Sequence, residues 1–277
     1  MTYKTILLII GANDQEKDLA AAADLTATAG AHLSVLVVQL AAPPAVGDYA
    51  ALSVALLDER AEEMKQLDEA VKRARATLKD LGISFDANGI YCETAWADDD
   101  LGSRARYADV TLIGASLQTD PSLRNRAIDG ALFYSARPVL LATNRQPVTL
   151  RPKKILLAWN STMESARAAR EAMELMESAE EVNVVLVDPS AAPARNGEEP
   201  GADIATYLAR HIVNVTVDRL PSAGRRVEEV LNQHAIDISA DLIVMGAYGH
   251  TRLRERIFGG VTKAMIERPI VPVLMVH

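Results

Sequence analysis

The stretch DLIVMGAYGHTRLRERIFGGVTKAMIERPIVPVLMV, residues 241–276, decides how the rest of the chain is interpreted. Its apolar run from Leu242 to Met245 is followed by Gly246, which is the pattern of a buried parallel strand that ends in a tight turn. Residues 261–268 then follow a helical pattern, and residues 271–276 form another apolar run. The stretch therefore predicts a strand, a glycine-rich loop, a helix and a second strand.

The loop carries three glycines at a defined spacing. Two residues separate Gly246 from Gly249, and nine separate Gly249 from Gly259. A single glycine after a strand is usually just a turn residue. Three of them between two apolar strands favour a loop whose backbone N–H groups can hold an anion, with help from the dipole of the following helix.

This spacing resembles the nucleotide-binding signature of the universal stress protein family. That signature is a glycine, two residues, a glycine, nine residues, and a glycine followed by serine or threonine. Gly260 departs from the pattern, because it stands where the family has a hydroxyl, and Thr262 supplies a hydroxyl two residues later. The resemblance implies a loop that binds ATP with one phosphate hydrogen bond fewer.

Length and composition predict an ordinary globular protein of two domains. At about 150 residues per domain, 277 residues correspond to two domains. The formal net charge of −8 disfavours nucleic acids and anionic membranes as partners. An anionic ligand therefore needs a local positive site. Three loop arginines could supply it, or could form a solvated face: Arg252, Arg254 and Arg256.

Cysteine and histidine usage points to a reducing compartment and gives no sign of a metal site. The only cysteine, Cys92, cannot form an intramolecular disulfide, and we expect it to serve packing. The apolar run from Ile6 to Ile10 is too short for a signal peptide or a membrane span, so we expect a cytoplasmic protein. The five histidines show no paired metal-ligand spacing. His250 lies inside the glycine loop, where it could touch a phosphate or simply be exposed.

The chain repeats one α/β pattern. Residues 4–10 are matched by 154–159, residues 108–115 by 240–247, and residues 138–141 by 272–275. Strands that alternate with helices pair in parallel through right-handed crossovers. We predict an α/β fold with two tandem copies of an open, mostly parallel five-stranded sheet flanked by helices, over residues 1–145 and 151–277. The fold is Rossmann-like, and the resemblance implies the adenine-nucleotide alpha-hydrolase type.

The local patterns also predict the individual elements. Helices should begin at capping boxes, Asn13 with Glu16 and Ser161 with Glu164. The expected helices are residues 13–29, 49–81, 95–108 and 261–268, and the expected strands are residues 4–10, 33–40, 83–91, 110–113, 139–142, 154–159, 184–187, 242–245 and 271–276.

Ligands of such sheets bind beyond the carboxyl ends of the strands, where the strand order reverses. The ends of two strands of the second copy, at Asn160 and at Gly246, should border that crevice. By the resemblance, Asn160 replaces the family's usual aspartate at adenine and ribose, and Val187 lines the adenine side; Asn160 could also cap the next helix. No catalytic or metal-ligating residue is predicted. The expected nucleotide-binding residues are Ala158, Trp159, Asn160, Val187, Met245, Gly246, Gly249, His250, Arg252, Gly259, Gly260, Val261 and Thr262.

The first copy carries a degenerate form of the motif. Leu117 stands where the motif has its second glycine, and the loop is two residues shorter. Asp129 falls near the expected phosphate position, where a carboxylate would repel the ligand. We therefore expect the first copy not to bind ATP in the manner of the family.

Together these features predict a stress-response protein that binds ATP, with Mg²⁺, in its second domain and uses it as a switch. No residue pattern supplies a general base, so fast hydrolysis is not expected. Two alternatives stay open: a ligand-free interaction scaffold, and a slow ATPase or adenylyl-transferring relative. By analogy with the family, residues 271–276 should pair with residues 139–142. A homodimer of such tandem chains also stays open.

Overall fold

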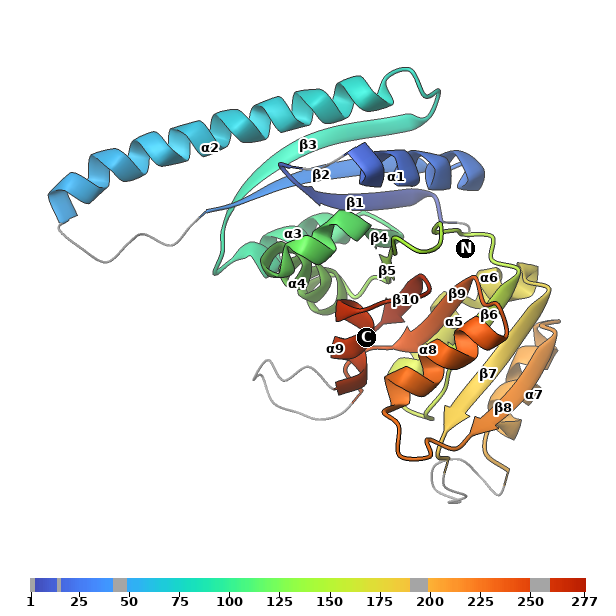
Figure 1. Cartoon of the computed structure of the whole chain (residues 1–277). Coiled ribbons are helices and arrows are strands. Elements are labelled where there is room, and N and C mark those ends of the chain that lie inside the picture. Colours follow the sequence, from blue (N-terminus) through green and yellow to red (C-terminus); the bar gives the residue numbers. More distant parts are fainter. Residues whose placement is uncertain (1–2, 14–15, 42–48, 190–198, 250–259) are drawn as a thin grey trace. The chain divides into compact units, whose positions relative to one another are not determined.

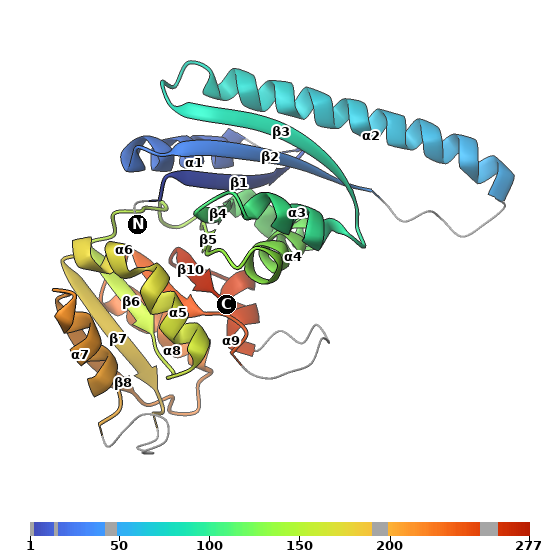
Figure 2. The same ribbon diagram turned by 180° about the vertical axis from the view of Figure 1, so that it is seen from behind.

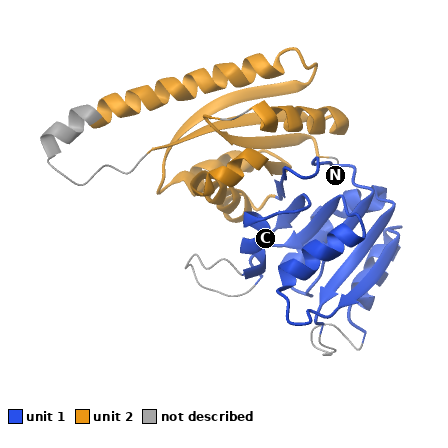
Figure 3. Cartoon of the chain, viewed as in Figure 1, with its two compact units in different colours: residues 1–2, 138–277 blue, residues 3–137 orange. Residues whose placement is uncertain are grey.

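The structure is a computed structural model that describes residues 3–13, 16–41, 49–189, 199–249 and 260–277, with the side chains of residues 49–55 outside the described part. The chain divides into two compact units (Figure 3). Residues 3–137 form the N-terminal unit, and residues 138–277 form the C-terminal unit. The His250, Arg252 and Gly259 of the predicted site lie outside the described residues.

The N-terminal unit is a parallel sheet with helices on both faces. Its elements are β1 (Thr5–Gly11), α1 (Glu16–Ala29), β2 (His32–Ala41), α2 (Tyr49–Leu78), β3 (Ser84–Glu93), α3 (Ala97–Ala105), β4 (Val110–Ile113), η1 (Ala115–Thr119), α4 (Pro121–Asp129) and η2 (Gly130–Tyr134). The strand order is β3-β2-β1-β4. The helices α1 and α2 lie on one face and α3 and α4 on the other (Figures 1 and 2), as right-handed crossovers require. The apolar centre of β1 is buried throughout, because helices cover both of its faces.

The C-terminal unit repeats this arrangement and adds two strands. Its elements are β5 (Val139–Leu141), β6 (Lys154–Ala158), α5 (Met163–Glu171), α6 (Met173–Ser178), β7 (Glu181–Val187), α7 (Ala202–Arg210), β8 (Val215–Leu220), α8 (Val227–Asp237), β9 (Leu242–Gly246), α9 (Gly260–Glu267) and β10 (Val273–Val276). The strand order is β5-β10-β9-β6-β7-β8. In Figure 1, α8 lies in front of the sheet, and in Figure 2, turned by 180°, α5 does. The predicted fold class, mostly parallel α/β sheets flanked by helices, is confirmed.

The strand β5 follows the first copy in the sequence but belongs to the sheet of the C-terminal unit. It pairs antiparallel with β10, with Leu140 opposite Leu274. Both leucine side chains are fully buried. The predicted pairing of residues 271–276 with residues 139–142 is therefore confirmed.

One predicted helix start is wrong by one residue. The N-cap of α5 is Thr162, whose Oγ1 accepts a hydrogen bond from Ser165 N at 3.4 Å, while Thr162 N donates to Ser165 Oγ at 3.1 Å. Ser161 cannot be the N-cap because its φ of 60° is left-handed, whereas an N-cap residue needs an extended backbone. The capping box thus joins Thr162 to Ser165 and not Ser161 to Glu164.

Cys92 is a packing residue, as predicted. Its side chain is buried, and burial, together with the nearby Asp100 carboxylate, raises the pKa of its thiol to about 12. A thiol that stays protonated is a poor nucleophile. None of the described helices combines the length and the apolar character that crossing a membrane requires.

The pairing of β5 with β10 makes Leu140 a core residue of the C-terminal unit. We predict that Leu140→Ala lowers the free energy of unfolding by about 2–5 kcal/mol, because it removes fully buried apolar groups and leaves a cavity. The measurement is the unfolding transition in urea. As a control, Leu57→Ala should change stability by less than about 0.5 kcal/mol, because Leu57 is 67% exposed. Equal losses in the two variants would contradict the burial of β5.

Candidate functional site

The strand order of the C-terminal unit reverses between β6 and β9. From β6 the chain continues to β7 on one side, whereas β9 lies on the other side, with Ala158 paired to Met245 and to Val185. Because all three strands are parallel, their carboxyl ends reach the same edge of the sheet. The structure therefore places the turn after β6 and the bend after β9 side by side, at the position where ligands of such sheets bind.

The turn after β6 is held by its own polar side chains. The Oδ1 of Asn160 accepts hydrogen bonds from Thr162 Oγ1 at 2.9 Å and from Thr162 N at 3.3 Å. The indole Nε1 of Trp159 donates to Ser161 Oγ at 3.0 Å. Asn160 thus braces the start of α5, and its side chain remains exposed at the edge of the sheet.

The bend after β9 requires glycine because α5 begins directly against it. A Cβ added to Gly246 would lie 2.6 Å from the backbone carbon of Glu164 and from the backbone nitrogen of Ser165, which is closer than real Cβ atoms approach. Two N–H groups of the bend are already used: Ala247 N donates to Val276 O at 2.8 Å, and Tyr248 N to Thr262 Oγ1 at 3.2 Å. The first glycine of the motif therefore serves helix packing.

Thr262 has a structural position that the sequence did not predict. It is only 5% exposed, and its hydroxyl accepts the hydrogen bond from Tyr248 N. This contact ties the first turn of α9 to the bend after β9, so the hydroxyl braces the loop. Gly260 and Val261 are more accessible in the same turn, and the first N–H groups of a helix have no partner within it.

The second glycine of the motif lies where the bend meets the turn after β6. A Cβ added to Gly249 would lie 3.2 Å from Glu164 Oε2 and 3.4 Å from Thr162 Oγ1. Within the described part of the chain, no acceptor pairs with the Gly249 N–H. Gly249 thus leaves room between a free backbone N–H, a hydroxyl and a carboxylate. Glu164 was not predicted as a site residue, because the sequence pattern indicated it only as the capping-box partner of Ser161.

The other predicted residues fall into two groups. Met245 is 4% exposed and belongs to the core, so only its backbone can face a ligand. Val187 ends β7, beside β6, and is half-buried at the same edge of the sheet as Asn160. No group of three His, Cys, Asp or Glu side chains that could hold a metal ion is found in the described ranges.

The N-terminal unit has a corresponding crevice with different chemistry. A cleft of about 530 Å³ opens at the carboxyl ends of β1, β2 and β4, where the order of this sheet reverses. Ser116 lines this cleft, and the buried Asp18 carboxylate on α1 accepts hydrogen bonds from its hydroxyl and from its backbone N, the latter at 3.3 Å. The sequence singled out Asp129 as the repelling carboxylate, but Asp129 is the last residue of α4, whereas residues at the start of α4 line the cleft.

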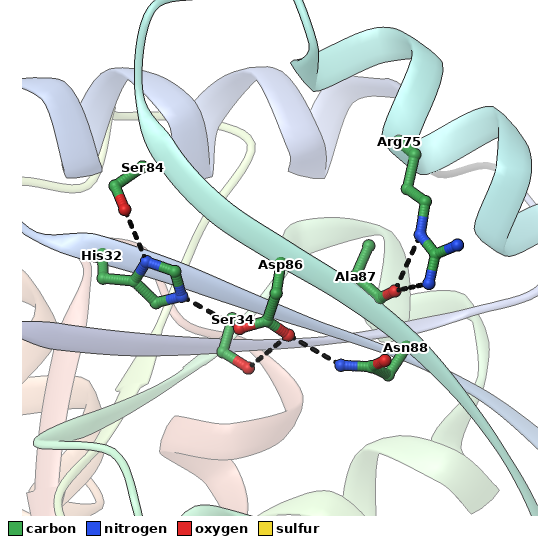
Figure 4. A network of polar contacts seen from close by, with 7 residues as sticks. All are labelled: His32, Ser34, Arg75, Ser84, Asp86, Ala87 and Asn88. Carbon is green, nitrogen blue, oxygen red and sulfur yellow. Dashed lines mark hydrogen bonds and ion pairs between the residues drawn. The ribbon is translucent and has the colours of Figure 1, made fainter.

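A second polar cluster of this unit lies at the opposite edge of the sheet. His32 and Ser84 begin β2 and β3, and His32 contacts Ser84 Oγ at 2.8 Å through Nδ1 and Asp86 Oδ2 at 2.9 Å through Nε2 (Figure 4). Asp86 also accepts hydrogen bonds from Ser34 and Asn88. Because the cluster sits at the amino ends of the strands, we assign it to the pairing of β2 with β3.

Comparison with known proteins identifies the C-terminal unit. Residues 152–277 match the Universal stress protein family and form a domain of that type. A universal stress protein from Archaeoglobus fulgidus DSM 4304 has the same fold, with a TM-score of 0.68 at 15% identity over 98% of this chain and 95% of that chain. A functionally unknown protein from Pseudomonas aeruginosa PAO1 matches with a TM-score of 0.56 at 15% identity over 99% of this chain and 92% of that chain. No curated protein matches the sequence.

The buried carboxylate of Asp18 should make the N-terminal unit sensitive to pH. Burial raises the pKa of Asp18 above its ordinary value, against the hydrogen bonds from Ser116, which lower it. A carboxyl group whose pKa is raised by folding costs stability once it ionises, so this cost is absent at low pH and develops as the pH rises through the unfolded-state value of 3.8. We predict that the wild type loses stability relative to Asp18→Asn as the pH rises from about 4 to 7. Urea unfolding of both proteins across that range measures the difference, and a difference that moves in favour of the wild type would contradict the prediction.

Proposed function

We propose that the C-terminal unit binds ATP as its magnesium complex in the crevice between the carboxyl ends of β6 and β9. The observation that carries this proposal is the position of Gly249, whose missing side chain leaves space beside Thr162 and Glu164. The proposal also draws on the family of residues 152–277 and on the reversal of strand order at this place.

The phosphate end of the ligand would lie at the bend after β9. The N–H of Gly249 and the first-turn N–H groups of α9, from Gly260 onward, are donors that need a partner. Phosphate oxygens suit such donors, and the positive end of the helix dipole adds to the attraction. The side chain of Thr262 contributes indirectly, by holding the bend in place.

The adenosine end would lie over β6 and β7. Asn160 is exposed at the end of β6, and Val187 is half-buried at the end of β7. An amide in place of a carboxylate can still hydrogen-bond a ribose hydroxyl, and the apolar Val187 side chain offers a surface for the flat face of a base. Asn160 has a donor group left for this role, because its contacts with Thr162 use only its Oδ1.

The same crevice suits a magnesium ion that arrives with the ligand. The Glu164 carboxylate supplies oxygen atoms, the ligand type that Mg²⁺ prefers, and Mg²⁺ commonly bridges one or two carboxylates to phosphates. The ion would neutralise phosphate charge beside Glu164. Without it, the Glu164 carboxylate would repel the phosphates of ATP.

We further propose that ATP acts as a switch on assembly or partner choice in a stress response, and that the N-terminal unit is a second domain of the same type. The two units share the strand order 3-2-1-4 in their own numbering, with the same crossovers. Among the described residues, the ionisable group nearest to the missing side chain of Gly249 is the Glu164 carboxylate, and a carboxylate beside phosphates is poorly suited to deprotonate an attacking water. A ligand-free scaffold and a slow ATPase remain the alternatives that the following measurements separate.

Replacing the second glycine of the motif should remove ATP binding. We predict that Gly249→Val weakens ATP at least about tenfold, because its Cβ alone would lie 3.2 Å from Glu164 Oε2 and its methyl groups would fill the phosphate position. Isothermal titration calorimetry with Mg²⁺ present gives the affinity, and circular dichroism checks that the variant is folded.

Gly260→Ser is the matched control in the same loop. A Cβ added there meets no described atom within 4 Å, and a hydroxyl can donate to a phosphate, so binding should be kept or strengthened. No binding of ATP to the wild type would favour the scaffold. Release of ADP over hours by the wild type, lost in Gly249→Val, would favour the slow ATPase.

The Glu164 carboxylate should make binding depend on magnesium. We predict that the wild type binds ATP about tenfold more tightly with Mg²⁺ than with a chelator, a difference of about 1.4 kcal/mol. Glu164→Gln should lose most of this preference, because an uncharged side chain no longer repels the free phosphates. Equal magnesium dependence in both proteins would place the ion away from Glu164.

A further inference from the structure

The crevice of the N-terminal unit has the place of a binding site but not the chemistry of an anion site. It lies at the carboxyl ends of β1, β2 and β4 and measures about 530 Å³, within the size range of small-molecule sites. Its described lining includes no Lys, Arg or His. It offers hydroxyl and amide groups, among them those of Asn13, Gln39, Thr94 and Thr119.

The backbone donors at the end of β4 are occupied by the protein itself. The Asp18 carboxylate, which is 4% exposed, lies so close to the bend that a Cβ on Gly114 would be 1.9 Å from its Oδ2. Both of its oxygens accept from Ser116 N at 3.3 Å, and the Ser116 hydroxyl donates to it as well. The Asp18 carboxyl group therefore uses the Ser116 N–H and hydroxyl, the donors of this bend that a phosphate would need.

A second carboxylate occupies the N-terminus of α4, the other part of the crevice that could attract an anion. Asp120 is the N-cap of α4, and its Oδ1 accepts from Leu123 N at 3.0 Å. The guanidinium of Arg73, which is not itself a lining residue, donates to the carbonyl oxygen of Ala12 at 3.1 Å and so is already paired at that atom. A phosphate entering this crevice would meet the Asp120 carboxylate in the lining, with the Asp18 carboxylate behind Ser116, and would lose its water of hydration without gaining a cationic side chain of the lining.

In the C-terminal unit, different atoms pack against the glycine that ends the corresponding strand. Gly246 packs against the backbone at Glu164 and Ser165, whereas Gly114 packs against a side-chain carboxylate. The edge formed by β1 and β2, at Ala12 and at Val38 to Ala41, corresponds to the edge of β6 and β7 that we assign to adenosine. The N-terminal unit thus retains the half of the crevice that would take a base and a sugar.

We propose that the N-terminal crevice binds an uncharged nucleoside and excludes its phosphorylated forms. The choice of a nucleoside rests on the proposed function of the C-terminal unit, whereas the exclusion of phosphate rests on Asp18 and Asp120 alone. The two units of one chain would then respond to different ligands, one to a nucleoside triphosphate and one to the free nucleoside.

Hydrogen–deuterium exchange of the full chain, read by mass spectrometry, localises each ligand to one unit. The probes are adenosine, AMP and inorganic phosphate. We expect adenosine to slow exchange in residues 36–41 and 115–123, AMP to bind there at least about tenfold more weakly, and phosphate to have no effect. AMP that protects these residues as well as adenosine does, or adenosine that does not protect them, would overturn the proposal.

Two variants test the role of the Asp18 carboxylate. Asp18→Ser introduces the residue type that the C-terminal unit has at Ser165 and should allow AMP to protect residues 115–123. Asp120→Asn is the comparison variant, because asparagine caps a helix as aspartate does. It should raise AMP binding less than Asp18→Ser, because Asp120 occupies the Leu123 N–H alone, whereas Asp18 occupies both the N–H and the hydroxyl of Ser116. An equal gain in both variants would show that overall charge excludes phosphate, and would overturn the role given to Asp18.

If Asp18→Ser does not fold, the comparison of adenosine with AMP in the wild type decides the matter alone. The same experiment separates this proposal from the function of the C-terminal unit. Binding of ATP to the C-terminal unit is measured in the peptides around residues 241–249 and 260–267. The absence of binding by ATP and the absence of binding by adenosine can therefore be told apart.

Discussion

In each unit, a glycine at the end of a strand lies very close to the start of the helix that follows the first strand. This close approach sets the shape of the crevice. The backbone of α5 lies so close to Gly246 that a Cβ at this position would clash with it. In the same way, the carboxylate of Asp18 lies too close to Gly114 for a Cβ there. Both contacts lie where the strand order reverses, the position at which ligands of such sheets bind.

The atoms that pack against this glycine differ between the two units, and they determine which groups are left to contact a ligand. In the C-terminal unit the contact is made by backbone atoms, and the next glycine leaves a gap between an N–H group, a hydroxyl and the Glu164 carboxylate. In the N-terminal unit a buried carboxylate uses the local donors. Burying an ionised group is costly unless hydrogen bonds compensate it, and Ser116 supplies them. Two units with the same strand order therefore have crevices with different polar groups at the corresponding bend.

The similarity to known proteins also differs between the two units. The fold is shared with known structures over nearly the whole chain at about 15% identity, whereas the family match is confined to residues 152–277. Buried apolar strands and crossover geometry maintain a fold through extensive sequence change. A ligand loop depends on a few residues at fixed spacing, and this spacing is complete to its third glycine in only one of the two units.

The sequence by itself determined the class of fold and nine of the ten described strands, but not β8 or the helices α4, α7 and α8. Apolar runs such as those of β1 and β9, and glycines such as Gly30 and Gly82 after helices, indicate strands and helix ends because these signals depend on neighbours within a few residues. It also located the edge where Asn160 and Gly246 meet, since parallel strands share an orientation. The pairing of β5 with β10 followed only from the family resemblance.

Only the tertiary structure decided the chemistry of the crevices. The contact of Asp18 with Ser116 joins residues 98 positions apart, and the packing of Glu164 beside Gly249 likewise joins distant segments. No local pattern marks these partners, because a carboxylate at the start of a helix looks the same whether it faces water or a distant loop. Even the capping box of α5 lies one residue later than the sequence pattern indicated, because the backbone at Ser161 is left-handed and Thr162 takes the N-cap position.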